Sequence, residues 1–333
     1  MDITLRSPLD MHLHLREGDM LDITVPISAR YFAGAVIMPN LVSPVDSLER
    51  LLSYRQAIES YSTDQNFIPY MTLFFKKYTR QDLEQSRDQI IGIKLYPAGI
   101  TTQSEAGVSN FSDIEETLSI MQELKIPLLV HGESNGFVLD REYEFLDVYR
   151  SLASRFPDLH IIMEHITTAD AVELLDEFDN LSATVTLHHL MITLDDVIGD
   201  LLRPDLFCKP VAKTPRDRSA LREAVFSGHQ RIMFGSDSAP HPRHKKECIG
   251  CAAGVFSAPV ALPLLAQIFE DAGHLDQLQG FVSSNACQRY QIKPPEKVVV
   301  LSQSPWQVPQ YYGDVSPFFA GQTIRWSINS TRS

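Results

Sequence analysis

Met11-His12-Leu13-His14-Leu15 is the first of five strand-like apolar runs that each end in a potential metal ligand. The other four are residues 90–94, 128–131, 161–165 and 232–237. A barrel of parallel strands brings the C-terminal ends of its strands to one face. Four histidines, one lysine and one aspartate would meet there, and such a set favours a metal ion over water.

The composition allows a large buried core. With 333 residues, 44% hydrophobic and 9% aromatic, the chain suits one α/β barrel with additions, or two domains. The net charge of −13 argues against a nucleic-acid partner. It does not exclude an anionic substrate, because a metal and one arginine can set the local field.

No targeting or membrane segment is expected. Asp2 and Arg6 stand where the apolar core of a signal peptide should begin. The apolar stretch at residues 255–269 is broken by prolines and polar residues, so no membrane partner is expected. The four cysteines are too few for a disulfide scaffold and fit a reducing compartment, which predicts a cytoplasmic protein.

Strand and helix signals alternate along the chain. Helical patterns such as residues 46–60, 140–155 and 168–178 separate strands predicted near residues 10, 36, 71, 93, 129, 162, 184 and 233. Eight strand-then-helix units predict an α/β fold, a parallel (β/α)8 TIM barrel, because parallel strands need crossover connections. The alternative, an open doubly wound sheet, would require a glycine-rich phosphate turn after the first strand, which the sequence lacks.

The end of the chain is predicted to extend the barrel. Residues 298–301 and 323–328 are two short β-like pieces beyond the last barrel unit. We therefore expect residues 1–333 to form a single domain, with residues 286–333 as a small β-containing extension packed on the barrel.

His12 and His14 stand two residues apart in a predicted strand, so both point to the same face. If that face is the barrel interior, two imidazoles could chelate a divalent ion, but two polar residues on a solvent-facing strand give the same pattern. His131 and His165, at matching ends of later strands, shift the balance towards ligands. Asp237 ends the eighth strand and can both ligate a metal and accept a proton.

Lys94 is the exceptional member of the set. Burial of an ammonium group is costly and favours loss of its proton. A neutral amine could add carbon dioxide and become a carbamate, an anionic ligand whose two oxygens could bridge two cations. A lysine that extends to solvent explains the same position, and the physical argument alone favours that simpler interpretation.

Six short motifs follow one another along the chain: DMHLHLR (10–16), MPN (38–40), KLYPA (94–98), LVHGE (129–133), EHITT (164–168) and DSAPH (237–241). Together they resemble the dihydroorotases, in particular the short bacterial type within the amidohydrolase superfamily. The similarity extends from about Ser7 to FAGQTIRWS at residues 319–327. Six motifs in the same order make it far more specific than any one of them.

The resemblance implies two Zn²⁺ ions per subunit at the mouth of the barrel. The residues that match the family's metal ligands are His12, His14, Lys94, His131, His165 and Asp237. The first two histidines and the aspartate would hold one ion, and the other two histidines the second. The lysine, carboxylated on its side-chain nitrogen (N6), would bridge them together with a water or hydroxide.

The implied reaction is the reversible cyclisation of N-carbamoyl-L-aspartate to L-dihydroorotate, in de novo pyrimidine (UMP) biosynthesis. Asp237 would be the catalytic residue that takes a proton from the hydroxide and delivers it to the leaving nitrogen. Arg16 would pair the substrate carboxylate in bidentate fashion. The implied substrate-binding set is His14, Arg16, Asn40, Thr101, Thr102, His131, Lys209, Ala239, His241 and Ala253. Lys209, Ala239 and Ala253 would act through their backbone groups.

Two of these assignments have simpler alternatives. Arg16 could form a surface ion pair with Glu17 or Asp19, although its position two residues after His14, on the same strand face, favours the site. Thr101 and Thr102 resemble a family loop that closes over the substrate, and an ordinary polar loop is the alternative.

Four further features are expected to be secondary. Lys209 departs from the apolar residue that is frequent in the family, but the contact there is through the backbone. His188 and His189 are interpreted as pocket or structural residues; the second matches a family histidine that is not a ligand. The Cys-x-x-Cys of residues 248–251 lacks the second pair that a zinc knuckle needs. The basic run 243–246 is expected to be a solvated loop near the mouth.

Three functions are weighed on this basis. The first is a dihydroorotase that acts on these small molecules as a homodimer. The second is another cyclic-amide hydrolase, such as a hydantoinase or allantoinase, but Arg16 and Asn40 suit a ring that bears a carboxylate. The third is a catalytically silent barrel that acts as a binding partner, and the presence of every expected ligand argues against it.

Overall fold

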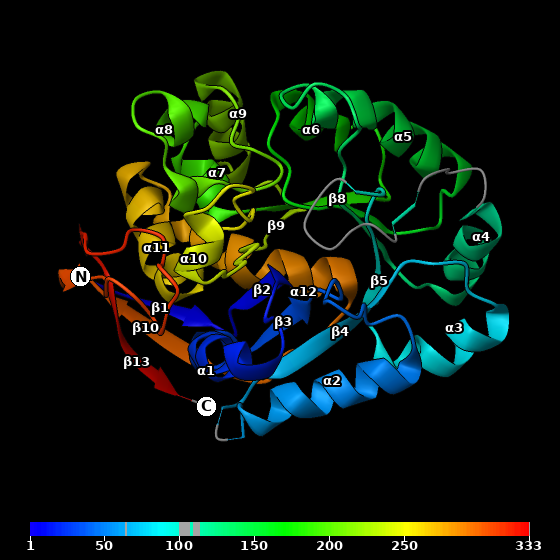
Figure 1. Cartoon of the computed structure of the whole chain (residues 1–333), viewed down its shortest axis with the longest axis horizontal. Coiled ribbons are helices and arrows are strands. Elements are labelled where there is room, and N and C mark those ends of the chain that lie inside the picture. The colour runs from blue at the N-terminus through cyan, green and yellow to red at the C-terminus, as the bar shows by residue number, and fades with distance from the viewer. Residues whose placement is uncertain (64, 100–106, 109–113, 333) are drawn as a thin grey trace.

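The computed structural model describes residues 1–63, 65–99, 107–108 and 114–332. One sheet of eight parallel strands curves into a barrel, which confirms the predicted (β/α)8 class (Figure 1). In order around the barrel, the strands are β2 (Leu9–Leu13), β3 (Gly34–Ile37), β4 (Ile68–Phe74), β5 (Gly92–Leu95), β6 (Leu128–Val130), β7 (Ile161–Met163), β8 (Leu181–Val185) and β9 (Ile232–Phe234). Every strand position predicted from the sequence falls inside one of them.

Helices cover the outside of the strands (Figure 1). Two lie close to their predicted ranges, α2 (Leu48–Ser60) and α5 (Arg141–Arg155). Helix α6 (Ala169–Leu174) is shorter than predicted, because the next three residues form hydrogen bonds of the i→i−3 type. The remaining α-helices are α1 (Leu21–Tyr31), α3 (Arg80–Ser86), α4 (Glu115–Leu124), α7 (Leu187–Met191), α8 (Leu194–Ile198), α9 (Pro215–Phe226), α10 (Arg243–Lys246), α11 (Ala261–Asp271) and α12 (Asn285–Tyr290).

Alternate residues of each strand pack on opposite sides of the sheet. Leu129 and Ile162 join a small cluster with Met233 inside the barrel, whereas their chain neighbours belong to the larger core under the helices. Strands buried on both faces read as continuous apolar runs, and this is why the sequence located them well. In β5, Ile93 and Leu95 belong to the outer core, so Lys94 between them points inward.

An irregularity in β2 changes the face that its residues occupy. The register between β2 and β3 shifts between Asp10 and Leu13. Met11 packs in the interior cluster before the shift, whereas Leu13 and Leu15 pack in the outer core after it. The shift therefore turns the even-numbered positions, including His12, towards the mouth of the barrel.

A buried carboxylate joins the first and last barrel strands. Asp10 accepts hydrogen bonds from the backbone nitrogen of Ser236 at 2.8 Å and from its hydroxyl at 2.5 Å. It also accepts one from the backbone nitrogen of His12 at 3.2 Å. Beyond it, Leu13 and Ser238 form a parallel bridge. Burial raises the pKa of Asp10 to about 7 against the opposing effect of these donors.

The C-terminal segment pairs with the start of the chain. Strand β10 (Val298–Ser302) lies between β1 (Asp2–Arg6) and β13 (Ser327–Arg332) in an antiparallel sheet (Figure 1). A second small sheet contains β11 (Trp306–Gln307) and β12 (Thr323–Ile324). The single piece predicted at 323–328 is therefore two strands, and β1 was not predicted. Among the described residues, no helix is long and apolar enough to cross a membrane.

We predict that Asp10→Ala lowers the free energy of unfolding by roughly 2–4 kcal/mol, because it leaves buried donors of two strands unpaired. Asp10→Asn should cost about 1 kcal/mol or less, since a neutral amide oxygen can still accept from the backbone and resembles the protonated acid. Urea unfolding of the three proteins at neutral pH measures the difference. Equal destabilisation by both substitutions would show that shape rather than hydrogen bonding closes the barrel.

Candidate active site

A small cavity opens where the C-terminal ends of the barrel strands meet. Its lining contains ten of the predicted site residues: His12, His14, Arg16, Asn40, His131, His165, Lys209, Asp237, Ala239 and Ala253. Two further residues, Tyr96 and Gly254, complete the lining and were not predicted. Thr101 and Thr102 lie outside the described residues.

The first potential metal site is formed by His12, His14 and Asp237. Nε2 of His12 lies 3.3 Å from Nε2 of His14, and Oδ1 of Asp237 lies 3.5 Å and 3.0 Å from these two atoms. One ligand atom from each residue lies within 4.8 Å of the other two, and all three side chains are buried. Two imidazoles and a carboxylate that converge in this way form a suitable set of donors for a divalent cation.

The second pair of histidines lies beside the first. Nδ1 of His131 is 3.2 Å from Nε2 of His165. The ring centroids of His165 and His12 are 4.9 Å apart, so the two groups adjoin. The structure thus brings together all four histidines that the sequence placed at strand ends.

Two buried glutamates orient these rings, and neither was predicted to have a role. Oε2 of Glu164 lies 2.6 Å from Nδ1 of His12, and Oε2 of Glu133 lies 2.7 Å from Nε2 of His131. Each carboxylate accepts a hydrogen bond from the nitrogen that faces away from the neighbouring histidine. The opposite nitrogen of each of these two rings then carries a lone pair that faces the neighbouring histidine, and a cation between the two rings could bind it.

Lys94 lies beneath this cluster. Its side chain is 0% exposed, and its Nζ has no hydrogen-bond partner within the described part of the chain. Burial lowers the pKa of Lys94 to about 8, against the opposing charges of Glu164 and Asp237. The alternative of a lysine that reaches solvent is therefore excluded by its position.

Burial also controls the ionisation of the other groups. It lowers the pKa of His12, His14 and His165, so these imidazoles are neutral at pH 7 and keep their lone pairs. It raises the pKa of Asp237 above the ordinary carboxyl value, although nearby His12 and Lys94 oppose the shift. A carboxylate whose proton affinity is raised is suited to exchange a proton near neutral pH.

The backbone at the cavity is unusual at three positions. Arg16, His165 and Asp237 have φ angles of 65°, 42° and 43°, in the left-handed region that non-glycine residues seldom adopt. Such conformations concentrate at functional sites, where the surrounding structure holds them. At Gly235, a Cβ atom would lie 2.9 Å from the Cβ of His12, so a larger residue would displace that histidine.

A second group of side chains forms a polar wall beside the histidines. Nε of Arg16 donates to the carbonyl of Pro240 at 3.1 Å, and its Nη2 lies 2.9 Å from Nε2 of His241. That nitrogen of His241 is also 3.0 Å from the carbonyl of Ala253. Arg16 is thus fixed at the cavity, and its ion pair with Glu17, the simpler alternative, is not formed because Glu17 pairs with Arg50 instead.

Lys246 corrects the expectation of a solvated basic loop. Its side chain is buried, and Nζ donates to the carbonyl oxygens of Phe207, Ala252 and Gly254 at 2.8–2.9 Å. The neighbouring Lys245 is exposed, as predicted. Lys246 therefore ties together the two segments that carry Lys209 and Ala253 at the cavity. The sequence does not distinguish a buried lysine that donates to three backbone carbonyls from a lysine that is exposed to solvent.

Relatives with similar sequences are named dihydroorotases. The chain is 43% identical to the dihydroorotase of Helicobacter hepaticus over 336 residues, which covers 98% of this chain and 97% of that protein. A crystal structure of dihydroorotase from Campylobacter jejuni is 52% identical, with a TM-score of 0.95 over 99% of this chain and 98% of that one. A structure of Saccharomyces cerevisiae dihydroorotase in complex with 5-fluoroorotic acid is 36% identical, with a TM-score of 0.92 over 98% of each chain. No protein-family model matches the sequence.

The barrel and its cluster of histidines, lysine and aspartate define a metal-dependent hydrolase of cyclic amides. Within this class, the similarity extends over nearly the full length of each relative. The chain belongs to the dihydroorotase family.

We predict that Lys246→Met loosens residues 246–254, because three buried carbonyls lose their common donor. Backbone amides there, such as that of Gly254, which donates to Phe207 at 2.9 Å, should exchange with deuterium at least about tenfold faster, as a local loss of roughly 1.4 kcal/mol implies. Lys245→Met is the matched control and should leave exchange unchanged. Exchange that is equally slow in both variants would show that Lys246 is not needed to hold this segment.

Proposed function

We propose that this chain catalyses the reversible conversion of N-carbamoyl-L-aspartate and L-dihydroorotate in pyrimidine biosynthesis. The observation that carries the proposal is the juxtaposition of the histidine and aspartate cluster with the fixed guanidinium of Arg16 in one cavity. Membership of the dihydroorotase family supports the same reaction. This membership also argues against the hydantoinase, allantoinase and silent-barrel alternatives.

The donor atoms fit two zinc ions. His12, His14 and Asp237 would hold one ion, while His131 and His165 would hold the other. The fit rests on neutral buried imidazoles whose lone pairs converge, and on two glutamates that hold the rings in that orientation. When bound, such a pair would supply Lewis acidity, which lowers the pKa of a water and polarises the ring carbonyl.

Lys94 would bridge the two sites as a carbamate. Its unpaired, buried Nζ and lowered pKa favour the neutral amine that can add carbon dioxide, with loss of one proton. The product is an anion with two oxygens, which would replace a buried cation by a ligand of opposite charge. This exchange would remove the repulsion between the ammonium and the two metals.

Asp237 would move the proton of the reaction. In the hydrolytic direction its carboxylate accepts a proton from the attacking water and passes it to the ring nitrogen that leaves. This role is supported by the position of Asp237 in the cavity lining and by its contacts with His12 and His14 at 3.5 Å and 3.0 Å. Cyclisation uses the same steps in reverse.

Arg16 would bind the carboxylate of the substrate, with Asn40 and His241 beside it. The guanidinium is suited to a bidentate pair with a carboxylate. His14 and His131 would contact the substrate from the metal side, and the remaining predicted contacts are Thr101, Thr102 and the backbone of Lys209, Ala239 and Ala253. We further expect a single domain with residues 286–333 as its extension, a homodimer and a cytoplasmic location, which stay predictions from the sequence.

Metal removal should abolish activity. An ultraviolet assay of dihydroorotate hydrolysis is expected to show turnover that disappears after exhaustive chelation and returns with added zinc. The reason is that the bound metal would lower the pKa of the attacking water and polarise the ring carbonyl. Metal content measured on the same samples is the control, and full activity in protein shown to be metal-free would contradict the mechanism.

Arg16 should determine which cyclic amides are hydrolysed. Dihydroorotate carries a ring carboxylate, whereas dihydrouracil and hydantoin do not, and the loss of a charge-assisted pair between the Arg16 guanidinium and that carboxylate would cost several kcal/mol. We expect dihydroorotate to be preferred by roughly 10³-fold or more in kcat/KM. Arg16→Ala should lose most of the dihydroorotate activity and keep its metals. Comparable turnover of dihydrouracil by the unmodified protein would instead indicate a broader cyclic-amide hydrolase.

A further inference from the structure

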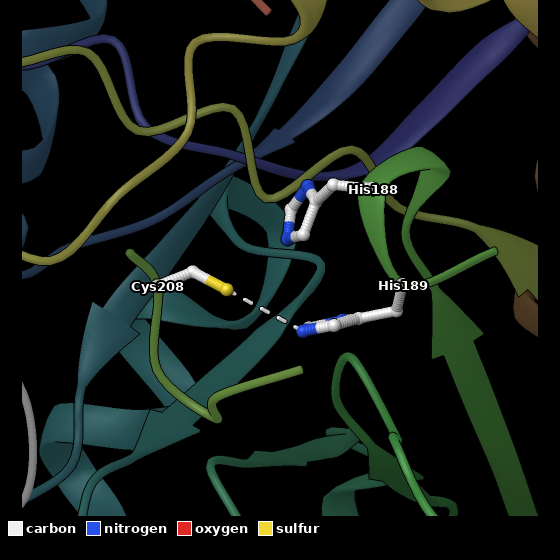
Figure 2. Close-up of side chains that lie close together, drawn as sticks. All are labelled: His188, His189 and Cys208. Atoms are coloured by element: carbon white, nitrogen blue, oxygen red, sulfur yellow. Dashed lines mark hydrogen bonds between the residues drawn. The ribbon is translucent and has the colours of Figure 1, made fainter. Parts of the chain in front are cut away.

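A second group of potential ligands lies outside the catalytic cluster. His188 and His189 belong to α7, directly after β8, and Cys208 lies in the segment that precedes Lys209 (Figure 2). One ligand atom of each side chain lies within 4.8 Å of the other two, and all three side chains are buried. Within the described ranges, the catalytic histidines and aspartate form the other group of this kind.

His188 is a buried imidazole without a hydrogen bond. Its side chain is 0% exposed, yet neither Nδ1 nor Nε2 has a partner among the described residues. An unpaired polar group in the interior costs roughly 1–3 kcal/mol, so such groups are rare and call for an explanation. Figure 2 shows a ring nitrogen of His188 facing the space between the thiol of Cys208 and the ring of His189. A ligand in that space would satisfy it.

His189 and Cys208 already have a separation that coordination requires. Sγ of Cys208 lies 3.5 Å from Nε2 of His189 (Figure 2). Bonds of about 2.3 Å to sulfur and 2.0–2.1 Å to nitrogen place two such ligands roughly 3.6 Å apart on a tetrahedral zinc ion. Nδ1 of His189 lies 2.9 Å from the hydroxyl of Thr186, an outer hydrogen bond that can orient the ring for binding through Nε2.

Binding would exchange existing weak contacts for bonds to the cation. Without a metal, Nε2 of His189 and the thiol of Cys208 both lie near the carbonyl of Pro210, at 3.1 Å and 3.3 Å. Coordination breaks the S–H bond of Cys208, forms a bond from sulfur to the metal and releases the proton to solvent. The ring proton of His189, which faces the Pro210 carbonyl from Nε2 without a metal, moves to Nδ1 so that Nε2 can bind. The imidazoles therefore stay neutral, and no electron is transferred.

The electrostatic surroundings explain which cation would fit. Burial raises the pKa of Cys208 to about 12 and lowers the pKa of both histidines, so an empty site carries a neutral thiol and two neutral imidazoles. The nearby positive charges of Lys246 and Lys213 oppose a cation but favour the thiolate. A thiophilic ion displaces the thiol proton outright, whereas Mg²⁺ or Ca²⁺ prefers oxygen ligands.

We propose that His188, His189 and Cys208 form an additional binding site for a thiophilic cation of the zinc class, separate from the catalytic cluster. The bound ion would join the start of α7 to the segment before Lys209, and would satisfy the unpaired nitrogen of His188.

Cobalt titration of the metal-loaded protein tests this site directly. Thiolate ligands to Co²⁺ give an intense near-ultraviolet charge-transfer band, and none of the proposed catalytic ligands contains sulfur. We expect the band to appear with about one equivalent of added Co²⁺ and to fall when Zn²⁺ competes. Cys208→Ser should abolish it, whereas Cys251→Ser, a matched change of a free cysteine, should preserve it.

A second variant keeps the test decisive if Cys208→Ser does not fold. His188→Gln retains the thiol but removes one nitrogen ligand, and should weaken Co²⁺ binding at this site by at least about tenfold. Absence of the band in the unmodified protein, or an unchanged band in folded Cys208→Ser, would overturn the proposal. Loss of the band in Cys251→Ser alone would assign the thiolate to the residue 248–251 loop and would also overturn it.

Discussion

The site depends on the closure of the barrel between its first and last strands. His12 lies in β2, His14 directly follows this strand, and Asp237 follows β9, so the two segments must keep one relative position for the three side chains to meet. Closure is held by the backbone bonds from Asp237 to His12 and from His14 to Ser238, at 2.9 Å and 3.2 Å, and by the buried carboxylate of Asp10. Asp10 stands at the point where the register of β2 shifts, so the contact that closes the barrel also fixes which face His12 occupies.

Burial allows many ionisable groups to share one small cavity. In water some histidines would be protonated, but desolvation lowers the pKa of His14 and His165 and keeps them neutral. Desolvation also lowers the pKa of Lys94 to about 8, so a fraction of this lysine is neutral near pH 7. The two carboxylates at the first site are each paired with a histidine, Glu164 with His12 and Asp237 with His14. The cavity therefore offers nitrogen lone pairs together with a small number of negative charges. Divalent cations are ligands that can bind both kinds of group.

The barrel and the convergence of the strand-end histidines and aspartate could be predicted from the sequence because both depend on local signals, whereas the role of Lys94 as a ligand was implied by the family resemblance alone. Buried parallel strands read as continuous apolar runs, and residues that follow their C-terminal ends gather at one face. Strand β1 was missed because its partner, β10, is almost the whole chain away. The roles of Glu133 and Lys246 were missed because they depend on contacts between segments that only the fold brings together. A glutamate within two residues of a strand-end histidine is a usable signal, and it is present in both LVHGE (129–133) and EHITT (164–168).

The catalytic cluster and the His188 group differ in the source of the negative charge that could balance the positive charge of a bound cation. In the catalytic cluster, Asp237 supplies a negative charge directly, and glutamates fix the histidine tautomers from outside. The His188 group has no carboxylate among its ligand atoms, so its only anion is the thiolate that a metal itself would create. Because Cys208 and Lys209 are adjacent, a cation bound to the thiolate would restrain the same short segment that lines the substrate cavity. The two sites would then be linked through one peptide unit, without any shared ligand.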